Sequence, residues 1–258
     1  MTPLINPKSL LFLDHPGPIP FAHRGGAGMF PENTLPAFKN AVEMGYKYLE
    51  TDVHSSKDGE VFAFHDESLE RVTGRTGKIS DFSATEISQI EIDGFAKIPT
   101  LIELLELFPK VKINIDPKAD SVVTPLINLL KRTNSVSRVC IGSFSDKRIK
   151  EMRKELGSEL CVSAGPKAVI KFLAGRFSFP KSKPAYHCLQ VPQRSGPVKI
   201  VTRDFIEKAH SRGLQVHVWT IDDEEEMNEL LDIGVDGLMT DEPSVLKNVL
   251  LERNLWWD

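Results

Sequence analysis

The chain has 258 residues, of which 41% are hydrophobic and 26% are charged, and its formal net charge at pH 7 is −4. A charge this small gives no general attraction to nucleic acid or to an anionic membrane, so neither is expected as a partner. No apolar run approaches the roughly 20 residues of a membrane-spanning helix, and the start lacks the features of a secretory leader. We therefore expect a cytoplasmic protein without a transmembrane segment.

The first apolar run, residues 19–22, ends in the motif His-Arg-Gly-Gly that begins at His23 and Arg24. Such a run is typical of a buried strand that breaks into a flexible loop at its end. A helix should follow, because apolar residues recur at a helical period between Thr34, a good N-cap, and Gly45, a good stop. The chain therefore opens with a strand and a helix, and the first two charged candidates lie between them.

The next strand is expected at residues 47–53, where Glu50 and Asp52 are two residues apart and share one face. Two carboxylates held about 6 to 7 Å apart in a partly dry site repel each other unless a cation or strong donors neutralise them. Such a pair suits a hard metal ion, although a solvated strand face is the alternative. The sequence thus indicates a metal site at the end of this strand.

An Asp-Gly turn at Asp58 leads into a return run at residues 60–64, which ends at His65. A two-stranded return across this turn would bring His65 back beside the carboxylates of the preceding strand. His65 and His23 each close an apolar run and each precede a charged residue. We therefore interpret both histidines as site residues and the return run as a hairpin.

Together these motifs resemble those of the glycerophosphodiester phosphodiesterase family. The amino-terminal set is specific as a combination, and the match continues weakly to the end of the chain. The matching motifs are His23-Arg24-Gly25, Pro31-Glu32-Asn33-Thr34, Glu50-Thr51-Asp52-Val53, Asp58-Gly59, His65-Asp66, Asn114-Ile115-Asp116-Pro117-Lys118, Val218-Trp219-Thr220, Asp236-Gly237 and Thr240-Asp241.

The resemblance implies an α/β fold of the (β/α)8 TIM-barrel type, and the periodicities agree with it independently. Residues 1–258 should form one barrel domain, with a small insertion at about 67–99 after the second strand that covers the site as a lid. Helices are expected at 145–156, 202–212 and 222–233, each followed by glycine. The eight strands are expected at 19–22, 47–53, 111–115, 138–142, 160–163, 186–189, 215–218 and 237–239.

In such a barrel the active site lies where the strands end and the following loops begin. A phosphodiester resists hydrolysis because its charge repels the nucleophile and its alkoxide leaves poorly, so charge neutralisation, a base and an acid are needed. The resemblance implies the same roles as this chemistry. They are an acid and base pair, His23 and His65; phosphate or substrate contacts, Arg24, Lys118 and Trp219; and ligands of a divalent metal, Ca²⁺ or Mg²⁺, at Glu50, Asp52 and Asp116.

Asp116 departs from the family pattern, in which glutamate is usual. A shorter ligand favours water-mediated binding or a larger, more adaptable ion such as calcium, so the identity of the metal stays open. We expect Glu32 and Asn33 to organise the loop by capping the helix that starts near Thr34, and the resemblance allows Glu32 a place at the site rim. Arg194 is expected as a contact for an anionic substrate group.

The remaining chemically notable residues are interpreted as structural. The three cysteines, Cys140, Cys161 and Cys188, are expected to be free buried thiols because their spacing is not that of a metal motif. An irregular region at 175–184 follows a helix and should lie at the opposite end from the site. The histidines in this class are His54, His187, His210 and His217.

The predicted function is metal-dependent hydrolysis of glycerophosphodiesters, small-molecule phosphodiester substrates, to glycerol 3-phosphate and an alcohol. Lysophospholipase D-type hydrolysis or cyclisation by the glycerol hydroxyl are chemical variants of it. A noncatalytic barrel that binds a phosphate ligand is the alternative from another class, and the presence of both histidines argues against it. The alcohol, the acid and base assignment within the histidine pair and the oligomeric state do not follow from the sequence.

Overall fold

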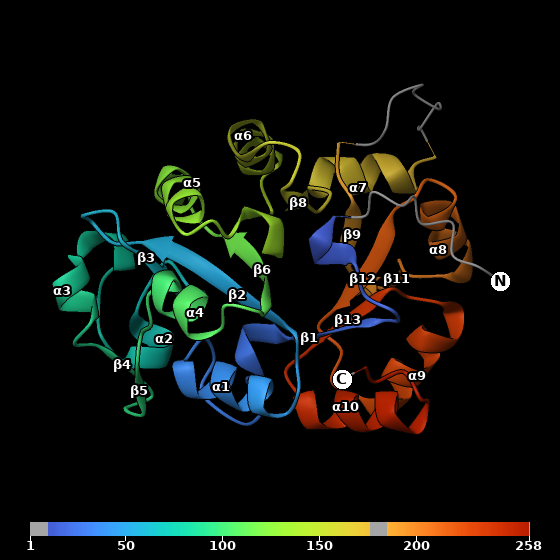
Figure 1. The fold of residues 1–258 in the computed structure, drawn as a ribbon, viewed down its shortest axis with the longest axis horizontal. Helices are drawn as coiled ribbons and strands as arrows, with labels where there is room; N and C mark the ends of the chain where they lie inside the picture. The colour runs from blue at the N-terminus through green and yellow to red at the C-terminus, as the bar shows by residue number, and fades with distance from the viewer. Residues whose placement is uncertain (1–9, 176–184, 258) are drawn as a thin grey trace.

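The computed structural model describes residues 10–175 and 185–257. Eight parallel strands form a barrel in the order β8-β7-β6-β2-β1-β13-β12-β9, so the predicted TIM-barrel fold is confirmed (Figure 1). All eight predicted strands are present, with ends that differ by a few residues. They are β1 (Ile19–Ala22), β2 (Tyr48–Ser55), β6 (Lys112–Pro117), β7 (Val139–Ile141), β8 (Cys161–Val162), β9 (Cys188–Pro192), β12 (Gln215–Trp219) and β13 (Gly237–Thr240).

The pairing of β1 with β13 and the pairing of β8 with β9 both close the barrel, but they differ in the number of paired residues. The first strand pairs with the last, β13, over four residue pairs from Ile19 to Ala22. Between β8 and β9 the ladder is short: one bridge joins Ser163 to Cys188, and the backbone amide of His187 donates to Val162. The seam between β8 and β9 is therefore the thinner closure.

Each barrel strand is followed by a helix that packs on the outside, as the predicted alternation requires. Side chains cap several of these helices as expected: Thr34, Ser145, Thr202 and Asp223 each accept from backbone amides in the first turn. The outer helices are α1 (Leu35–Glu43), α4 (Leu101–Leu107), α5 (Val123–Arg132), α6 (Asp146–Leu156), α7 (Pro166–Leu173), α8 (Arg203–His210), α9 (Glu224–Ile233) and α10 (Pro243–Glu252).

Alternate strand residues pack into different cores. On β6, Ile113 and Ile115 face outward into the apolar layer under the helices, and on β9, Leu189 and Val191 do the same. The intervening residues face the barrel interior, whose lower part is filled by Phe21, Tyr48 and other apolar groups. The interior near the carboxyl ends of the strands is instead polar, which places the candidate site there.

A short segment closes the amino-terminal end of the barrel. In η1 (Leu11–Leu13), Phe12 inserts beneath Phe21 and Tyr48, with ring centroids 6.2 and 5.4 Å away. The Tyr48 hydroxyl donates to the Phe12 carbonyl at 2.8 Å, and Gln215, the first residue of β12, donates to Leu13. The bottom of the barrel is therefore plugged, and the opposite end is free for chemistry.

The insertion after β2 begins with β3 (Val61–Ala63), which pairs antiparallel with β2 and confirms the predicted hairpin. The rest has a small core of its own, built on Phe62 and Phe64, and lies beside α4 in Figure 1. Its first residues, among them Glu67 and Arg71, line a cavity beside His65, and its expected role as a lid stays a prediction. Its elements are α2 (Glu70–Thr73), η3 (Ile79–Asp81), α3 (Ala84–Ile87), β4 (Glu91–Ile92) and β5 (Ala96–Lys97).

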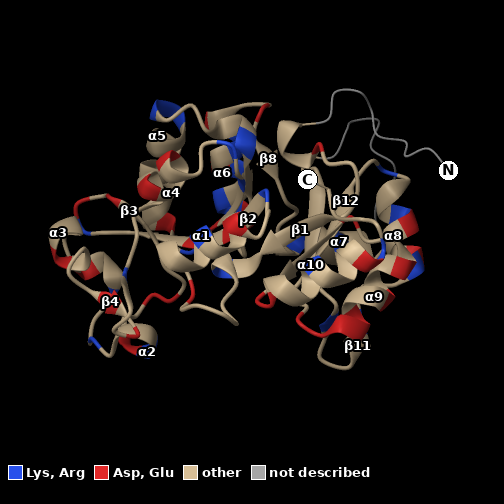
Figure 2. Cartoon of the chain, turned by 60° about the horizontal axis from the view of Figure 1, so that its bottom comes forward, with Lys and Arg blue, Asp and Glu red and all other residues tan. Residues whose placement is uncertain are grey.

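The remaining short elements are η2 (His23–Gly25), η4 (Asp120–Val122), η5 (Val136–Arg138) and the hairpin β10 (Arg194–Ser195) with β11 (Val198–Lys199). Charges of both signs mix along α8 on the outer surface (Figure 2). Within residues 10–175 and 185–257 no helix is long and apolar enough to cross a membrane. Of the irregular region predicted at 175–184, residues 176–184 lie outside the described residues.

Candidate active site

The loop after β1 positions His23 and Arg24. Gly25 has a φ of +86°, and a Cβ there would lie 2.9 Å from the Phe38 backbone nitrogen, so only glycine fits this turn. Arg24 also adopts a left-handed conformation, with a φ of 49°, and its backbone amide donates to Glu50 at 3.1 Å. The main chain of the His-Arg-Gly motif is thereby fixed against β2.

His23 lies between two carboxylates. Its Nδ1 is 2.8 Å from Oδ1 of Asp241, which follows β13, and its Nε2 is 3.7 Å from Oε2 of Glu50. Burial opposes protonation of this imidazole, but Glu50 and Asp241 outweigh burial and raise the pKa of His23 above its ordinary value. Burial and the neighbouring Asp52 carboxylate raise the pKa of Glu50 to about 7.

Asp52, two residues further along β2, is neutralised from two sides. The Lys118 ammonium lies 2.9 Å from its Oδ1, and Nε of Arg24 lies 3.2 Å from its Oδ2. Burial opposes ionisation, but Lys118 and Arg24 lower the pKa of Asp52 below its usual value. Lys118 also reaches Asp116 at 3.1 Å, because β2 and β6 pair with Asp52 directly beside Asp116. Burial raises the pKa of Asp116.

The loop between β1 and α1 supports this arrangement. The buried Asn33 side chain donates to Asp52 at 3.3 Å and accepts from the Thr51 hydroxyl at 2.7 Å. Glu32 accepts from Arg24 at 3.1 Å, and Thr34 caps α1. The expectation that Glu32 and Asn33 cap α1 is therefore wrong, because the Thr34 side chain supplies the cap. Glu32 and Asn33 instead hydrogen-bond to Arg24 and Asp52 of the site.

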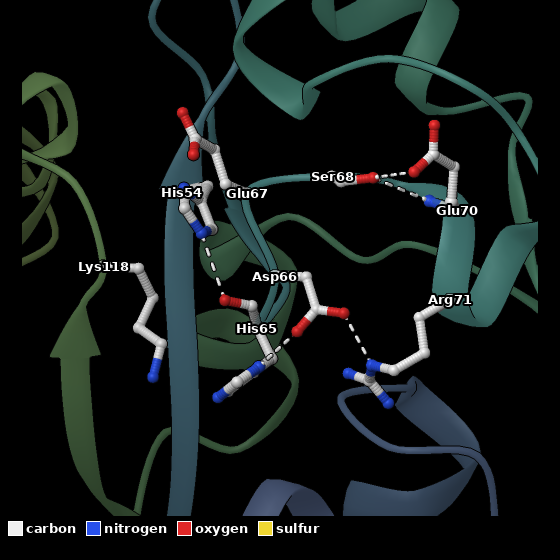
Figure 3. Close-up of a pocket in the computed structure, with 8 residues that line it drawn as sticks. All are labelled: His54, His65, Asp66, Glu67, Ser68, Glu70, Arg71 and Lys118. Carbon is white, nitrogen blue, oxygen red and sulfur yellow. Dashed lines mark hydrogen bonds and ion pairs between the residues drawn. The ribbon is translucent and has the colours of Figure 1, made fainter.

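His65 comes from the hairpin, as predicted. The Phe64 amide donates to the Asp52 carbonyl at 2.9 Å, which brings the following His65 back to the carboxylates. The Nδ1 of His65 lies 2.5 Å from Asp66, and Nε of Arg71 lies 2.5 Å from the other oxygen of Asp66 (Figure 3). The hydrogen bond from Arg71 is the main reason why the pKa of Asp66 falls to about 2.

Arg71 links the two halves of the site. Its terminal nitrogens donate to both carboxylate oxygens of Glu32 at 2.9 and 2.7 Å. Arg71 therefore connects Glu32, the partner of Arg24, with Asp66, the partner of His65. His54, which we interpreted as structural, lines the same space, and its Nε2 lies 3.2 Å from the His65 carbonyl oxygen. The open cavity here has a volume of about 680 Å³ and is lined by His54, His65, Asp66, Glu67, Ser68, Glu70, Arg71 and Lys118.

The three predicted metal ligands lie at one end of the barrel, but they do not converge on a single point. In the described part of the chain, the carboxylates of Glu50, Asp52 and Asp116 do not form a set with ligand atoms within 4.8 Å of one another. The Lys118 ammonium forms ion pairs with both Asp52 and Asp116 and so neutralises part of their negative charge. The three carboxylates are largely buried, and only two cationic side chains, Arg24 and Lys118, lie beside them to balance their negative charge. The donor set therefore suits an additional hard cation.

The other two predicted contacts differ in their surroundings. Trp219 ends β12 and is half-buried, and its ring meets that of Phe144 edge to face at 5.8 Å. Phe144 follows β7, so both aromatic groups belong to the same end of the barrel as His23. Arg194 lies on the exposed β10–β11 hairpin, where it donates to the Pro197 carbonyl, and its proposed contact with substrate stays a prediction.

Sequence reasoning did not assign roles to three residues of this site. Asp66 and Asp241 were present in the motifs, and the position of each next to a strand end was the available signal. Arg71 had no such signal, because only the packing of the insertion brings it to Asp66 and Glu32. All three are partners of groups that the sequence did identify.

Comparison with known proteins finds both sequence and structural relatives of this chain. A family model described as the glycerophosphoryl diester phosphodiesterase family matches residues 23–245. A probable glycerophosphodiester phosphodiesterase 2 of Mycobacterium tuberculosis is 36% identical, covering 95% of each chain. A human lysophospholipase D is 29% identical over 89% of this chain and 85% of its own. The crystal structure of a putative glycerophosphoryl diester phosphodiesterase from Silicibacter pomeroyi has a TM-score of 0.80 at 23% identity, covering 96% of this chain and 99% of its own.

Proposed function

This chain belongs to the glycerophosphoryl diester phosphodiesterase family and is a phosphoric diester hydrolase, and from that premise we propose that it cleaves glycerophosphodiesters to glycerol 3-phosphate and an alcohol. The proposal has two chemical parts. His23 and His65 form the acid and base pair, and Glu50, Asp52 and Asp116 bind a divalent cation, Ca²⁺ or Mg²⁺.

The observation that supports the histidine part best is that each imidazole is held at Nδ1 by its own carboxylate. Asp241 holds His23 at 2.8 Å, and Asp66 holds His65 at 2.5 Å. A carboxylate at Nδ1 fixes the ring orientation and the tautomer, and it leaves Nε2 of the ring for proton transfer. Two imidazoles arranged in this way suit a reaction that needs one proton removed and another delivered.

In the proposed reaction, an oxygen of water bonds to phosphorus, and the bond from phosphorus to the alcohol oxygen breaks. If the glycerol hydroxyl attacks instead, the product is a cyclic glycerol phosphate, and a second attack by water breaks one of its ring P–O bonds to give glycerol 3-phosphate. One imidazole accepts the proton of the attacking oxygen, and the other, as imidazolium, donates a proton to the departing alcohol oxygen. The reaction class does not depend on which of His23 and His65 has which role.

The residues also fit an anionic substrate. Nε of Arg24 is buried and donates no hydrogen bond within the described structure, although it lies near Asp52. A buried guanidinium donor without an acceptor is costly, and a phosphate oxygen would satisfy it. Lys118, at the edge of the cavity, supplies a second positive charge. Both cations would stabilise the extra negative charge on the phosphoryl oxygens in the transition state.

The carboxylate set fits a hard divalent cation in donor type and charge. Glu50 and Asp52 are 4% and 3% exposed, and the raised pKa of Glu50, about 7, reflects a buried charge that its neighbours do not fully compensate. Carboxylate oxygens are the ligands that Ca²⁺ and Mg²⁺ prefer. When bound, such a cation would neutralise phosphate charge and polarise the phosphoryl group.

A second candidate function, lysophospholipase D-type hydrolysis, is favoured by the aromatic pair at the rim. Phe144 is 69% exposed, and its ring meets that of Trp219 edge to face at 5.8 Å, at the same end of the barrel as the polar site. An acyl chain on the glycerol moiety would find apolar contact there. Choline release from a lysophosphatidylcholine would then accompany the glycerophosphodiester reaction.

The test is a substrate panel with purified protein after EDTA treatment, with and without added CaCl₂ or MgCl₂. The panel contains glycerophosphocholine, glycerophosphoethanolamine, glycerophosphoinositol and a lysophosphatidylcholine, and the readouts are glycerol 3-phosphate and free choline. We expect metal-dependent release of glycerol 3-phosphate. Full activity in verified metal-free protein overturns the metal part, and binding of a diester without turnover under any metal leaves a noncatalytic binding barrel.

A further inference from the structure

The three cysteines lie together inside the barrel, although they are 21 and 27 residues apart in the sequence, from 140 to 161 and from 161 to 188. They are Cys140 on β7, Cys161 on β8 and Cys188 on β9, three strands that are neighbours around the barrel. Their strand neighbours Val162 and Leu189 face the outer apolar layer, whereas the cysteines face the interior. The fold thus brings together three thiols that lie far apart in the sequence.

The geometry of this thiol cluster, defined as Cys140, Cys161 and Cys188, is that of a metal site. All three sulfur atoms lie within 4.8 Å of one another, and those of Cys140 and Cys188 are 4.0 Å apart. Sulfur ligands at the usual metal–sulfur distance of about 2.3 Å are about 3.8 to 4.0 Å from each other around one ion. The cluster is therefore close to a three-sulfur coordination sphere without movement of the strands.

The surroundings keep solvent away from the three sulfur atoms. All three side chains are fully buried, in an apolar layer that includes Phe21 and Met239. A closed set of buried sulfur ligands is typical of a structural metal site.

We propose that the thiol cluster is a second metal site, separate from the carboxylates, that takes a soft d¹⁰ cation, Zn²⁺ or Cu⁺. Thiolate sulfur selects these ions over calcium and magnesium. Each thiol that binds as thiolate releases one proton to solvent, and no oxidant or reductant is consumed.

A polar layer of side chains separates this cluster from the proposed reaction centre. Gln190 donates to Asn114 at 2.8 Å and lies 3.4 Å from Nδ1 of His217. These residues face the interior one step nearer the carboxyl ends of the strands than Cys188 on β9. The lower end is closed by η1 through Phe12. A metal held there would tie β7, β8 and β9 together, across the thin seam of the barrel, and would stabilise the fold without touching substrate.

The test uses the full chain, purified in a phosphine reductant under argon and freed of metal. Excess MgCl₂ is present throughout to saturate the carboxylate site, and either Zn²⁺ or Cu⁺ is then added. We expect one equivalent of at least one of these ions to bind, with an ultraviolet thiolate-to-metal charge-transfer band and a raised melting temperature. Because the chain contains three cysteines in total, the band reports on this cluster alone.

Cys161→Ala and Cys188→Ala should each abolish the bound equivalent and the charge-transfer band. Ile19→Val, which removes one methylene from the same interior layer, is the matched control and should bind as wild type. Ion binding that survives both cysteine variants, or wild type that takes up neither ion with a thiolate signature, overturns the proposal. If the cysteine variants do not fold, the wild-type titration decides it. The two ion arms distinguish a zinc site from a copper site.

Discussion

The Nδ1 atom of His23 lies 2.8 Å from the Asp241 carboxylate, although the two residues are 218 positions apart in the chain. The contact exists because β1 and β13 are neighbours in the barrel and both residues follow the ends of their strands. The proposed acid or base is therefore oriented by the last strand of the fold. The corresponding partner of His65 is its direct neighbour, Asp66.

We expect His23→Ala and His65→Ala each to lower kcat on glycerophosphocholine by about 10² to 10⁴, the usual loss when a general acid or base is removed. His210→Ala is the matched control, because His210 also pairs with an aspartate, Asp236, but does so on α8. Its kcat should equal that of wild type. Steady-state kinetics with saturating metal decide the matter, and wild-type turnover in either site variant would remove that histidine from the mechanism.

Asp241→Asn should keep the shape of the site while removing the charge at Nδ1 of His23. The amide no longer fixes the tautomer or favours the protonated ring, so kcat should fall by about 10² or more while KM changes little. Because Asp241 raises the pKa of His23, the same variant should lower it, which NMR titration of the ring measures. Asp232→Asn, a change at an exposed carboxylate on α9, should alter neither quantity. An unshifted His23 titration would contradict this role for Asp241.

Arg71→Ala tests the link between the insertion and the site. Arg71 depresses the pKa of Asp66 to about 2, below the value of about 3.9 expected in the unfolded chain. A depressed carboxyl pKa stabilises the fold above about pH 4, and that contribution is lost as pH falls toward 2. The variant should therefore unfold in acid at a higher pH than wild type does.

The same variant should lower kcat about tenfold to hundredfold, because Asp66, which holds His65, loses its contact with Arg71. Arg71→Lys, which keeps one charge but not the two-pronged contact with Glu32, should recover part of the kcat. The measurements are acid unfolding by circular dichroism and steady-state kinetics. An unchanged acid midpoint together with unchanged kcat would show that the insertion does not support the site.

Glu50→Gln should separate function from stability. The pKa of Glu50 in the folded protein is about 7, above the value of about 4.3 for the unfolded chain. The folded state therefore binds the extra proton between these values, and the free energy of unfolding falls as pH rises from about 4 to 7. In metal-free protein the glutamine variant should be more stable than wild type at pH 8, by about 1 to 3 kcal/mol, and nearly equal at pH 5.

Thermal unfolding in EDTA at the two pH values measures this difference. Activity of Glu50→Gln with added metal should be strongly reduced, because a ligand charge is lost. A stability change of the same size at pH 5 and pH 8 would mean that the charge of Glu50 is not the cause.

Asp116→Glu tests the third proposed metal ligand. One additional methylene changes the reach of the carboxylate, so the activity ratio between Ca²⁺ and Mg²⁺ should change, because magnesium requires a tighter geometry. Activity is measured after EDTA treatment over a titration of each ion. The same ratio as in wild type would place Asp116 outside direct contact with the metal.

Most of the fold followed from the sequence because its signals are local. The apolar runs, the caps such as Thr34 and the glycine stops mark each strand and helix without knowledge of the rest. The eight strands were therefore found, whereas the packing of the insertion was not predicted. Its apolar residues have no period that shows which surface they cover, and only the hairpin residues Phe62 and Phe64 provide that surface.

The site was predictable to the extent that its residues lie at strand ends. Glu50, Asp52 and His65 come together because strand periodicity and one turn are enough to place them. Arg71 and the thiol cluster were not predictable in this way. The contact of Arg71 with Asp66 depends on how the insertion packs, and the meeting of three cysteines depends on the register of three strands. The spacing of these residues along the chain predicts neither contact.

The pairing of β1 with β13 has a consequence for synthesis. A growing chain has made His23, Glu50 and His65 long before residues 237–240 leave the ribosome, and until then one edge of β1 has no partner. An open edge of apolar strand can pair with other chains, so the nascent protein is exposed to aggregation for nearly its whole synthesis. Enzymatic competence should consequently arise in one late step, when the last strand arrives with Asp241 and seals the sheet.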